Sequence, residues 1–266
     1  ATILSNLGGA WSDLGDAKKA IEYHEQALSI DKEVYGERHP STATSLSNLG
    51  TAWRSLGDAK KAIEYHEQAL SIDKEVYGER HPSVATILSN LGLAWGELGD
   101  AKKAMEYYEQ ALSIGKEVYG EKHPCVATHL RNLGGAWSEL GDAKKAIEYY
   151  GQALSIGKEV YGERHPSVAT MLSGLGLAWS ELGDAKKAIE YYEHALSIDK
   201  EVYGERHPSV ATILSGLGLA WRELGDAKKA IGYLQEAYDI LRESYGDEDP
   251  ITKGLRAVLN VLEKTN

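Results

Sequence analysis

Residues 4–40 read "LSNLGGAWSDLGDAKKAIEYHEQALSIDKEVYGERHP" and contain two helical patterns separated by a glycine. The apolar residues of the first pattern recur at steps of three and four, which places them on one face of an α-helix: Leu4, Leu7, Trp11 and Leu14. Gly15 is typical of a helix end, and Asp16 is typical of the residue that caps a following helix. The stretch therefore predicts a helical hairpin.

The second pattern runs from Ala17 to Tyr35 and is also amphipathic. Its length predicts a helix of roughly 28 Å, against roughly 20 Å for the first. Gly36 is expected to end it, and Pro40 then marks a turn by holding the preceding His39 in an extended conformation. The face predicted to be buried consists of Ala20, Ile21, His24, Ala27, Leu28 and Tyr35.

The same hairpin returns every 42 residues along the chain. A fixed period of this length indicates a repeat array, and no segment shows the alternating pattern of a β-strand. We therefore expect an all-α solenoid of stacked antiparallel helix hairpins, with six repeats in residues 1–252 and a C-terminal capping helix in residues 252–266. The period is marked by Trp11, Trp53, Trp95, Trp137, Trp179 and Trp221.

The segments "NLGGAW" and "LGDAKKAIEYHEQAL" resemble the tetratricopeptide repeat. The resemblance covers residues 1–252, although the unit here has 42 residues instead of the usual 34. Long repeats with Gly, His-Pro and "NLG" in register are similar to those of kinesin light chains. The resemblance implies a right-handed superhelix that serves as a protein-binding scaffold. It is carried by Leu7, Gly8, Trp11, Ala20, His24 and Ala27.

Composition and charge exclude several classes of function. Hydrophobic residues make up 42% of the 266 residues, which is enough for a large core. The net charge is −11 and the lysines and arginines alternate with acidic residues, so we expect no nucleic-acid partner. No apolar run approaches the 18–20 residues of a membrane span, so no membrane partner is expected. The single cysteine, Cys125, favours a reducing, cytoplasmic location.

The motif "YGERHPSVAT", at 77–86, 161–170 and 203–212, could be a repeated catalytic or metal-binding constellation or only a corner. Ligands must lie within about 2.0–2.2 Å of one ion, whereas packed helices are about 8–10 Å apart. Histidines of successive repeats are therefore too distant to share a metal. The last repeat has "GDEDP" instead, so the histidine is dispensable to the turn. We interpret the motif as a corner and expect no catalytic residue, metal or cofactor.

The remaining candidates are weaker. A nucleophilic role for Cys125 has no repeated acid–base partner to support it. His24, His66, His129 and His194 are expected to be packed or solvated side chains, and the paired lysines that begin at Lys18 are expected to form a solvated outer face. The glycines are interpreted as helix ends or packing positions.

The polar side of the first helices is the best candidate for recognition. With these helices lined up inside the stack, it would form the wall of a groove. A row of amides on it could hydrogen-bond to the backbone of an extended peptide, as related long-repeat scaffolds are thought to do. The alternative is that Asn is a common surface residue duplicated with the rest of the unit. The row consists of Asn6, Asn48, Asn90 and Asn132, and continues as Gly174 and Gly216.

The copies also differ from one another mostly along this wall. Leucine on a solvent-exposed helix face is typical of a ligand pocket, and arginine is a frequent anchor at interfaces. Unselected drift on an exposed surface would give the same variation. The candidate peptide-binding residues outside the amide row are Arg54, Leu93, Arg131, Leu177, Leu219 and Arg222.

The sequence thus predicts a non-enzymatic scaffold that binds a peptide segment of a partner protein. A structural or self-assembling array is the alternative, because Ala1 enters directly into a repeat without a preceding lid, and this edge could associate end to end with another copy or continue into more repeats of a longer parent. An enzyme is a distant third, since no unrepeated cluster of ionisable residues is present. The array could also be the sensor part of a larger switch protein.

Overall fold

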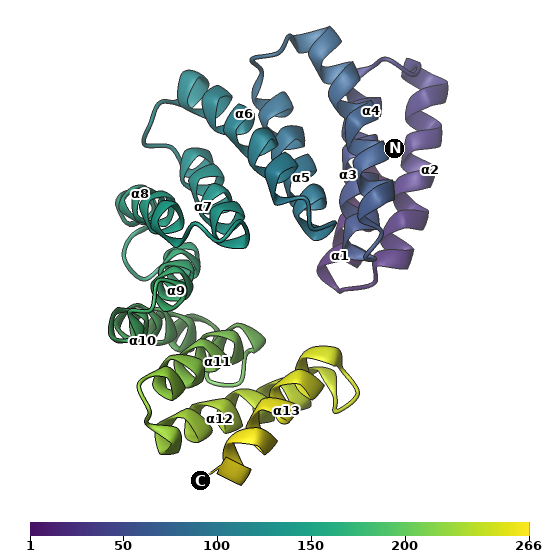
Figure 1. Cartoon of the computed structure of the whole chain (residues 1–266). Helices are drawn as coiled ribbons and strands as arrows, with labels where there is room; N and C mark the ends of the chain where they lie inside the picture. Colours follow the sequence, from purple (N-terminus) through teal and green to yellow (C-terminus); the bar gives the residue numbers. More distant parts are fainter. Residues whose placement is uncertain (266) are drawn as a thin grey trace. The chain divides into compact units, whose positions relative to one another are not determined.

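The computed structural model describes residues 1–265, and this part of the chain consists of helices without strands (Figure 1). The all-α fold predicted from the sequence is confirmed. The helices are α1 (Thr2–Asp13), α2 (Ala17–Tyr35), α3 (Pro40–Ser55), α4 (Ala59–Tyr77), α5 (Pro82–Glu97), α6 (Ala101–Tyr119), α7 (Pro124–Glu139), α8 (Ala143–Tyr161), α9 (Pro166–Glu181), α10 (Ala185–Tyr203), α11 (Pro208–Glu223), α12 (Ala227–Tyr245) and α13 (Pro250–Thr265).

The chain forms two compact units, and the division falls within α7. Unit 1 contains Ala1–His129, and unit 2 begins at Leu130. Successive helices pack on one another from α1 to α6 in unit 1 and from α8 to α13 in unit 2. The odd-numbered helices also contact one another, α1 with α3, α3 with α5, and α9 with α11. These odd helices form one layer of each unit, and the even helices form the other.

Short-range chemistry fixes the helix ends where the sequence predicts them. Asp16 accepts a hydrogen bond from the backbone N–H of Lys19 and so caps α2. Gly15 and Gly36 adopt φ values of +79° and +89°, a conformation that a side chain would strain. The cap and both glycines recur in the later hairpins, with Asp58 and Gly57 as an example.

The "GERHP" segment is a helix start. His39 lies in extended conformation before Pro40, and its Nδ1 accepts a hydrogen bond of 3.1 Å from the backbone N–H of Ser41. The imidazole stacks on Tyr35 with ring centroids 4.6 Å apart. Asp249 takes over the capping role in the last corner by accepting from the backbone N–H groups of Ile251 and Thr252, which explains why the histidine can be absent there.

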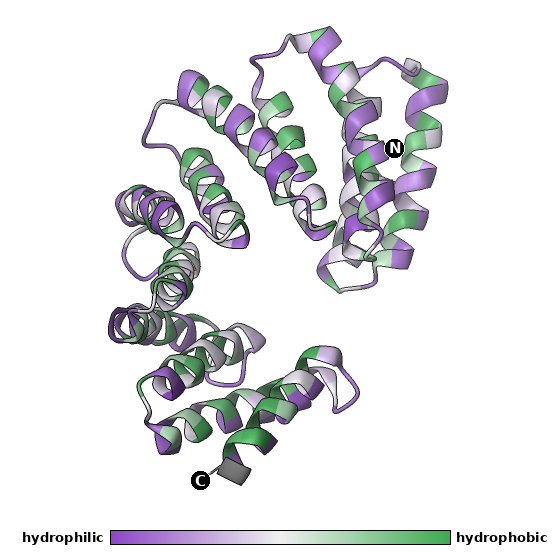
Figure 2. Ribbon diagram, in the orientation of Figure 1, coloured by the Kyte–Doolittle hydropathy of each residue, from purple (hydrophilic) through white to green (hydrophobic). Residues whose placement is uncertain are grey.

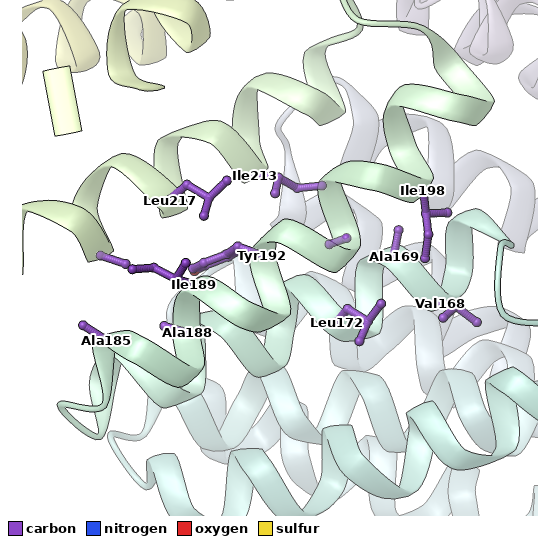
Figure 3. Packing of buried hydrophobic residues seen from close by; sticks show 12 residues of the cluster. Val168, Ala169, Leu172, Ala185, Ala188, Ile189, Tyr192, Ile198, Ile213 and Leu217 are labelled. Atoms are coloured by element: carbon purple, nitrogen blue, oxygen red, sulfur yellow. The ribbon is translucent and has the colours of Figure 1, made fainter. Parts of the chain in front are cut away.

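The core depends on close approach of the two helices in each hairpin. A Cβ atom added to Gly176 would lie 2.9 Å from the ring of Tyr192, so only glycine fits at this crossing. The Gly8 crossing is equally tight, with the ring of His24 at 2.6 Å, which agrees with the packing role predicted for this glycine. Tyr192 belongs to a cluster in which α9, α10 and α11 bury Leu172, Ile189, Ile198, Ile213 and Leu217 (Figure 3).

Some residues of the predicted buried faces are exposed. Tyr35 is 54% exposed, because it covers the corner histidine instead of the core. Leu14 is 74% exposed and lies after the end of α1, where the chain leaves the helical pattern. Leu7 is 41% exposed, whereas its equivalent on α3, Leu49, is buried in a cluster with residues of α2. Figure 2 shows the same mixture of apolar and polar residues around each helix.

Both lysines of each pair are exposed, as the sequence predicts. The second lysine also makes a specific contact, since the Nζ of Lys61 lies 3.6 Å from the centroid of the Trp53 ring. The same cation–π contact occurs in all six repeats and joins the start of each even helix to the odd helix before it. Each tryptophan of the 42-residue period is therefore paired with a lysine.

Candidate functional site

The predicted peptide-binding residues belong to a side-chain surface of the odd helices, which we call the wall. In unit 1 it contains Asn6, Asn48, Asn90, Leu93 and Arg54 on α1, α3 and α5. Asn6 is exposed, and the other four are half-buried. All five side chains keep some access to solvent, so part of each can contact a ligand without rearrangement of the helices.

The amide of Asn48 already has a partner within the wall. Its Nδ2 donates a hydrogen bond of 3.0 Å to the Oγ of Ser5 on α1. This bond fixes the orientation of the amide and leaves its Oδ1 as an acceptor. Arg54 is also engaged, because its Nη1 lies 2.6 Å from Oε1 of Glu97 on α5. A ligand that uses Arg54 as an anchor has to compete with this ion pair.

In unit 2 the wall contains Arg131, Asn132, Leu177, Leu219 and Arg222. Leu177 is 45% exposed and Arg222 is exposed, whereas the other three are half-buried. An exposed leucine on a helix face that also carries charged residues is available for apolar contact with a partner.

Where the amide row gives way to glycine in unit 2, aromatic rings lie against the glycines. A Cβ at Gly174 would lie 2.5 Å from the Tyr150 ring, and one at Gly216 would lie 2.5 Å from the Tyr192 ring. Asparagine at either position would collide with these rings. The equivalents of Tyr150 in unit 1 are His24, His66 and Tyr108, and the matching equivalents of Gly174 are all asparagine, Asn132 in the case of Tyr108. A tyrosine at this position therefore does not exclude the amide in every repeat.

The tyrosines lie close to charged groups of the wall. Burial raises the pKa of Tyr150 to about 12, with Arg131 acting in the opposite sense and Glu181 and Glu139 adding to the increase. The carboxylate of Glu181 accepts a hydrogen bond of 2.5 Å from the Oγ of Ser138. The equivalent Ser180 donates to Glu223 at 3.1 Å. Glutamates at the C-terminal ends of odd helices thus join neighbouring odd helices.

Three buried histidines lie in unit 1. His66 is fully buried, neither of its ring nitrogens has a hydrogen-bond partner in the described structure, and burial together with the charge of Arg54 lowers its pKa to about 4. Burial also lowers the pKa of His129 to about 4 and that of His24 below its usual value. These imidazoles are packed side chains, as expected, whereas His194 is exposed.

Cys125 lies beside a corner histidine, as the equivalent serines do, and also near His129, which only this repeat carries. Its Sγ lies 3.0 Å from the Nδ1 of His123, and both Cys125 and His129 border the space above Gly115. Burial raises the pKa of the thiol, which disfavours the thiolate form needed for nucleophilic attack. In the described part of the chain no three His, Cys, Asp or Glu side chains are grouped in a way that could hold a metal.

One buried residue of unit 1 is missing from the predicted buried face. Asp31 is charged, but it lies four residues after Ala27 and therefore on the buried face of α2, beside Ser45, at the floor of a hollow between α1, α2 and α3. A signal was present, because Ser45 takes a position at which other repeats carry Ile87, Met171 or Ile213.

Comparison with known proteins identifies the class to which this repeat architecture belongs. The sequence model of the tetratricopeptide repeat matches residues 1–75, 52–117, 84–158, 138–201 and 167–243. The chain therefore belongs to the tetratricopeptide repeat family, and the resemblance noted in its residues is confirmed. Repeats of this family generally mediate protein–protein interactions and are generally non-enzymatic.

Several solved structures have the same fold. BtubC (BKLC) from P. vanneervenii is 25% identical, with a TM-score of 0.72 over 88% of this chain and 94% of that one. A putative kinesin light chain from Podosopora anserina, described as having nearly identical TPR-like repeats, is 24% identical, with a TM-score of 0.64 over 78% of this chain and 98% of that one. The apo form of RapI is 18% identical, with a TM-score of 0.72 over 99% and 97% of the two chains.

No curated protein matches the chain. None of the helices described is both long enough and apolar enough to cross a membrane.

Proposed function

We propose that the wall of the odd helices binds a peptide segment of a partner protein. The observation that carries this proposal is that the side chains of the wall keep access to solvent while differing from repeat to repeat. Leu177 is exposed, and the equivalent positions hold Gly9, Thr51 and Gly135 but also Leu93 and Leu219. A surface with this individuality can distinguish one peptide from another, whereas uniform helix surfaces cannot.

The two units offer different chemistry to such a peptide. The wall of unit 1 presents amides and an Arg–Glu pair, which can exchange hydrogen bonds with a peptide backbone. The wall of unit 2 presents leucines next to glycines, which allow close apolar contact. We infer moderate affinity, because much of the wall is polar.

The test is selection from a randomised peptide library displayed on phage, followed by affinity measurements with the selected peptides. The triple variant Asn48→Ala, Asn90→Ala and Asn132→Ala should weaken binding by at least tenfold, because each amide would lose hydrogen bonds to the peptide. A matched triple variant, Gln68→Ala, Gln110→Ala and Gln152→Ala, removes exposed amides from even helices and should leave affinity unchanged. Unchanged capture by the asparagine variant would refute the role of the amide row.

A second candidate function is association of copies of the chain through α1. Ile3 is 78% exposed on this helix, Leu7 is also exposed, and so is Leu14 directly after its end. Sedimentation over a range of concentrations tests this candidate, which requires a dimer that Ile3→Glu dissociates. A monomer at all concentrations would refute it. We also propose that α13 caps the array, with Leu259 buried against Leu234 and Tyr238 of α12.

A further inference from the structure

A hollow of about 440 Å³ lies between α1, α2 and α3 in unit 1. One side is polar and includes Ser5, Asn6 and Asn48 from the wall. The opposite side is formed by α2, where Ile30 and Val34 present partly exposed apolar surface. The hollow is thus amphipathic, and it opens onto the part of the wall that carries the first amides.

The floor of the hollow is a buried carboxylate. Asp31 is 5% exposed, and its Oδ2 accepts a hydrogen bond of 2.6 Å from the Oγ of Ser45, which is also buried. A carboxylate can accept about four hydrogen bonds, and a buried charge is costly unless it is paired. Ser45 is the one donor found for Asp31 in the described structure, so Asp31 retains acceptor capacity for a donor that enters the hollow.

No other repeat combines a carboxylate with a small residue at these two positions. Asp73 and Asp199 occupy the position of Asp31, but Ile87 and Ile213 occupy the position of Ser45 and are buried. In these repeats the carboxylates bond to Ser83 and Ser209 at the helix starts. The remaining pairs are Gly115 with His129, Gly157 with Met171, and Leu241 with Leu255.

The polar groups around the hollow favour a ligand that donates hydrogen bonds. One N–H of the Asn48 amide is used in the bond to Ser5, and its Oδ1 remains as an acceptor. The hydroxyl proton of Ser45 is likewise directed to Asp31. Carboxylate and amide oxygens near one opening match the ammonium or guanidinium group of a basic side chain, whose methylene stem would pack on Ile30 and Val34.

We propose that this hollow binds a lysine or arginine side chain of the peptide that occupies the wall. The inference rests on the proposed function and adds a specific anchor to it. One such anchor in a single repeat sets the register of the peptide along otherwise similar repeats. The cation pairs with Asp31 and replaces the missing hydrogen-bond donors.

Titration with end-blocked pentapeptides, followed by amide chemical shifts in NMR spectra, tests the anchor. Ac-Ala-Ala-Lys-Ala-Ala-NH₂ and its arginine counterpart should shift the amides of Ser45 and Asn48 with a Kd of roughly 1 mM. The norleucine counterpart, which keeps the stem and lacks the charge, should bind at least tenfold more weakly. Equal binding of the norleucine peptide, or no shift at Ser45 with the basic peptides, would overturn the proposal.

Two variants locate the effect at the floor. Asp31→Asn keeps the acceptor for Ser45 but removes the charge, and should weaken the basic peptides at least tenfold. Asp199→Asn is the matched control in unit 2 and should change nothing, because Ile213 already fills the space beside that carboxylate. Ser45→Ile copies the later repeats and should close the hollow, with Ser41 available to bond Asp31 as Ser83 bonds Asp73.

Circular dichroism of each variant shows whether the helices are retained. Retained binding in both Asp31→Asn and Ser45→Ile, with helices intact, would overturn the anchor. If library peptides then still depend on the asparagines of the wall, the proposed function stands without the anchor. If basic peptides fill the hollow but no library peptide binds the wall, the proposed function fails separately.

Discussion

In unit 1 the aromatic side chain of the second hairpin is His66, and the wall residue at the related position is Asn90. In unit 2 the equivalent residues are Tyr150 and Gly174, and the tyrosine ring fills the space that an asparagine side chain would need. The difference shows that a side chain of an even helix can limit what the wall presents at a given position. At Gly174 and Gly216 the ring of the even helix occupies the space beside the odd helix, and the wall has no side chain there, whereas Asn132 is retained at the position that matches Tyr108.

A second set of paired differences involves an even helix and the odd helix that follows it. Gly115 and Gly157 replace aspartates found in other repeats, and the vacated space is bordered by His129 and Met171. Near-identical repeats thus differ at pairs of positions, where a smaller side chain at one position accompanies a larger one at the other. Paired differences of this kind argue against unselected drift as the source of the variation at these positions.

The largest effect on this difference between the units is expected when the asparagine of unit 1 is placed at the equivalent position of unit 2. Gly174→Asn should destabilise the protein by about 3 kcal/mol, because the new Cβ would lie 2.5 Å from the Tyr150 ring in a closely packed core. Urea unfolding followed by tryptophan fluorescence measures the change. Gly9→Asn provides the control, since nothing lies within 4 Å of a Cβ at Gly9, and it should cost less than about 1 kcal/mol.

The double variant Gly174→Asn with Tyr150→His reproduces the pair found in unit 1 and should recover at least half of the loss. A double-mutant cycle isolates this coupling from the cost of each single change. Purely additive losses would contradict the pairing of the two positions.

The sequence predicts the helices well because each boundary has a local cause, such as the cap formed by Asp16 or the positive φ of Gly36. It predicts the glycine at the Gly8 crossing for the same reason, since the pattern itself shows which face is buried. The aromatic ring against Gly174, where the amide row gives way to glycine, could not be predicted from the sequence, because Tyr150 belongs to another hairpin. The burial of Asp31 and the cover of Trp53 by Lys61 also depend on tertiary contacts.

The buried histidines make unit 1 the acid-sensitive unit. When the folded pKa of a histidine lies below its unfolded value of about 6.5, the free energy of unfolding decreases as the pH falls from that value toward the folded pKa. For His129, with a folded pKa of about 4, this loss amounts to about 2 kcal/mol between pH 7 and pH 5. His129→Met copies the Gly157–Met171 pair and should reduce the acid loss by that amount in urea unfolding at the two pH values.

The control for this prediction is His194→Met, an exposed histidine of unit 2, which should leave the acid loss unchanged. Hydrogen exchange at pH 5 should also show faster opening in unit 1 than in unit 2. Equal acid loss in the wild type and in His129→Met would show that this imidazole does not carry the effect.

The smallest expected effect concerns a contact that the two units share. Lys103→Met removes the cation that lies 3.6 Å from the centroid of the Trp95 ring and should cost about 0.5–1 kcal/mol of unfolding free energy. Lys187→Met in unit 2 should cost the same, because the geometry over Trp179 is equivalent. The neighbouring Lys102 is exposed, so Lys102→Met serves as the control with no measurable change.

The central claim is that the wall of the odd helices is the recognition surface and that its two parts differ in chemistry. Amide chemical shifts of the protein with a bound library peptide test this claim directly. The account predicts shifts at Asn48, Asn90 and Leu177 on odd helices and none at the exposed residues Gln68 and Glu193 of even helices. Shifts confined to the even helices, or to the exposed face of α1 at Ile3, would contradict it.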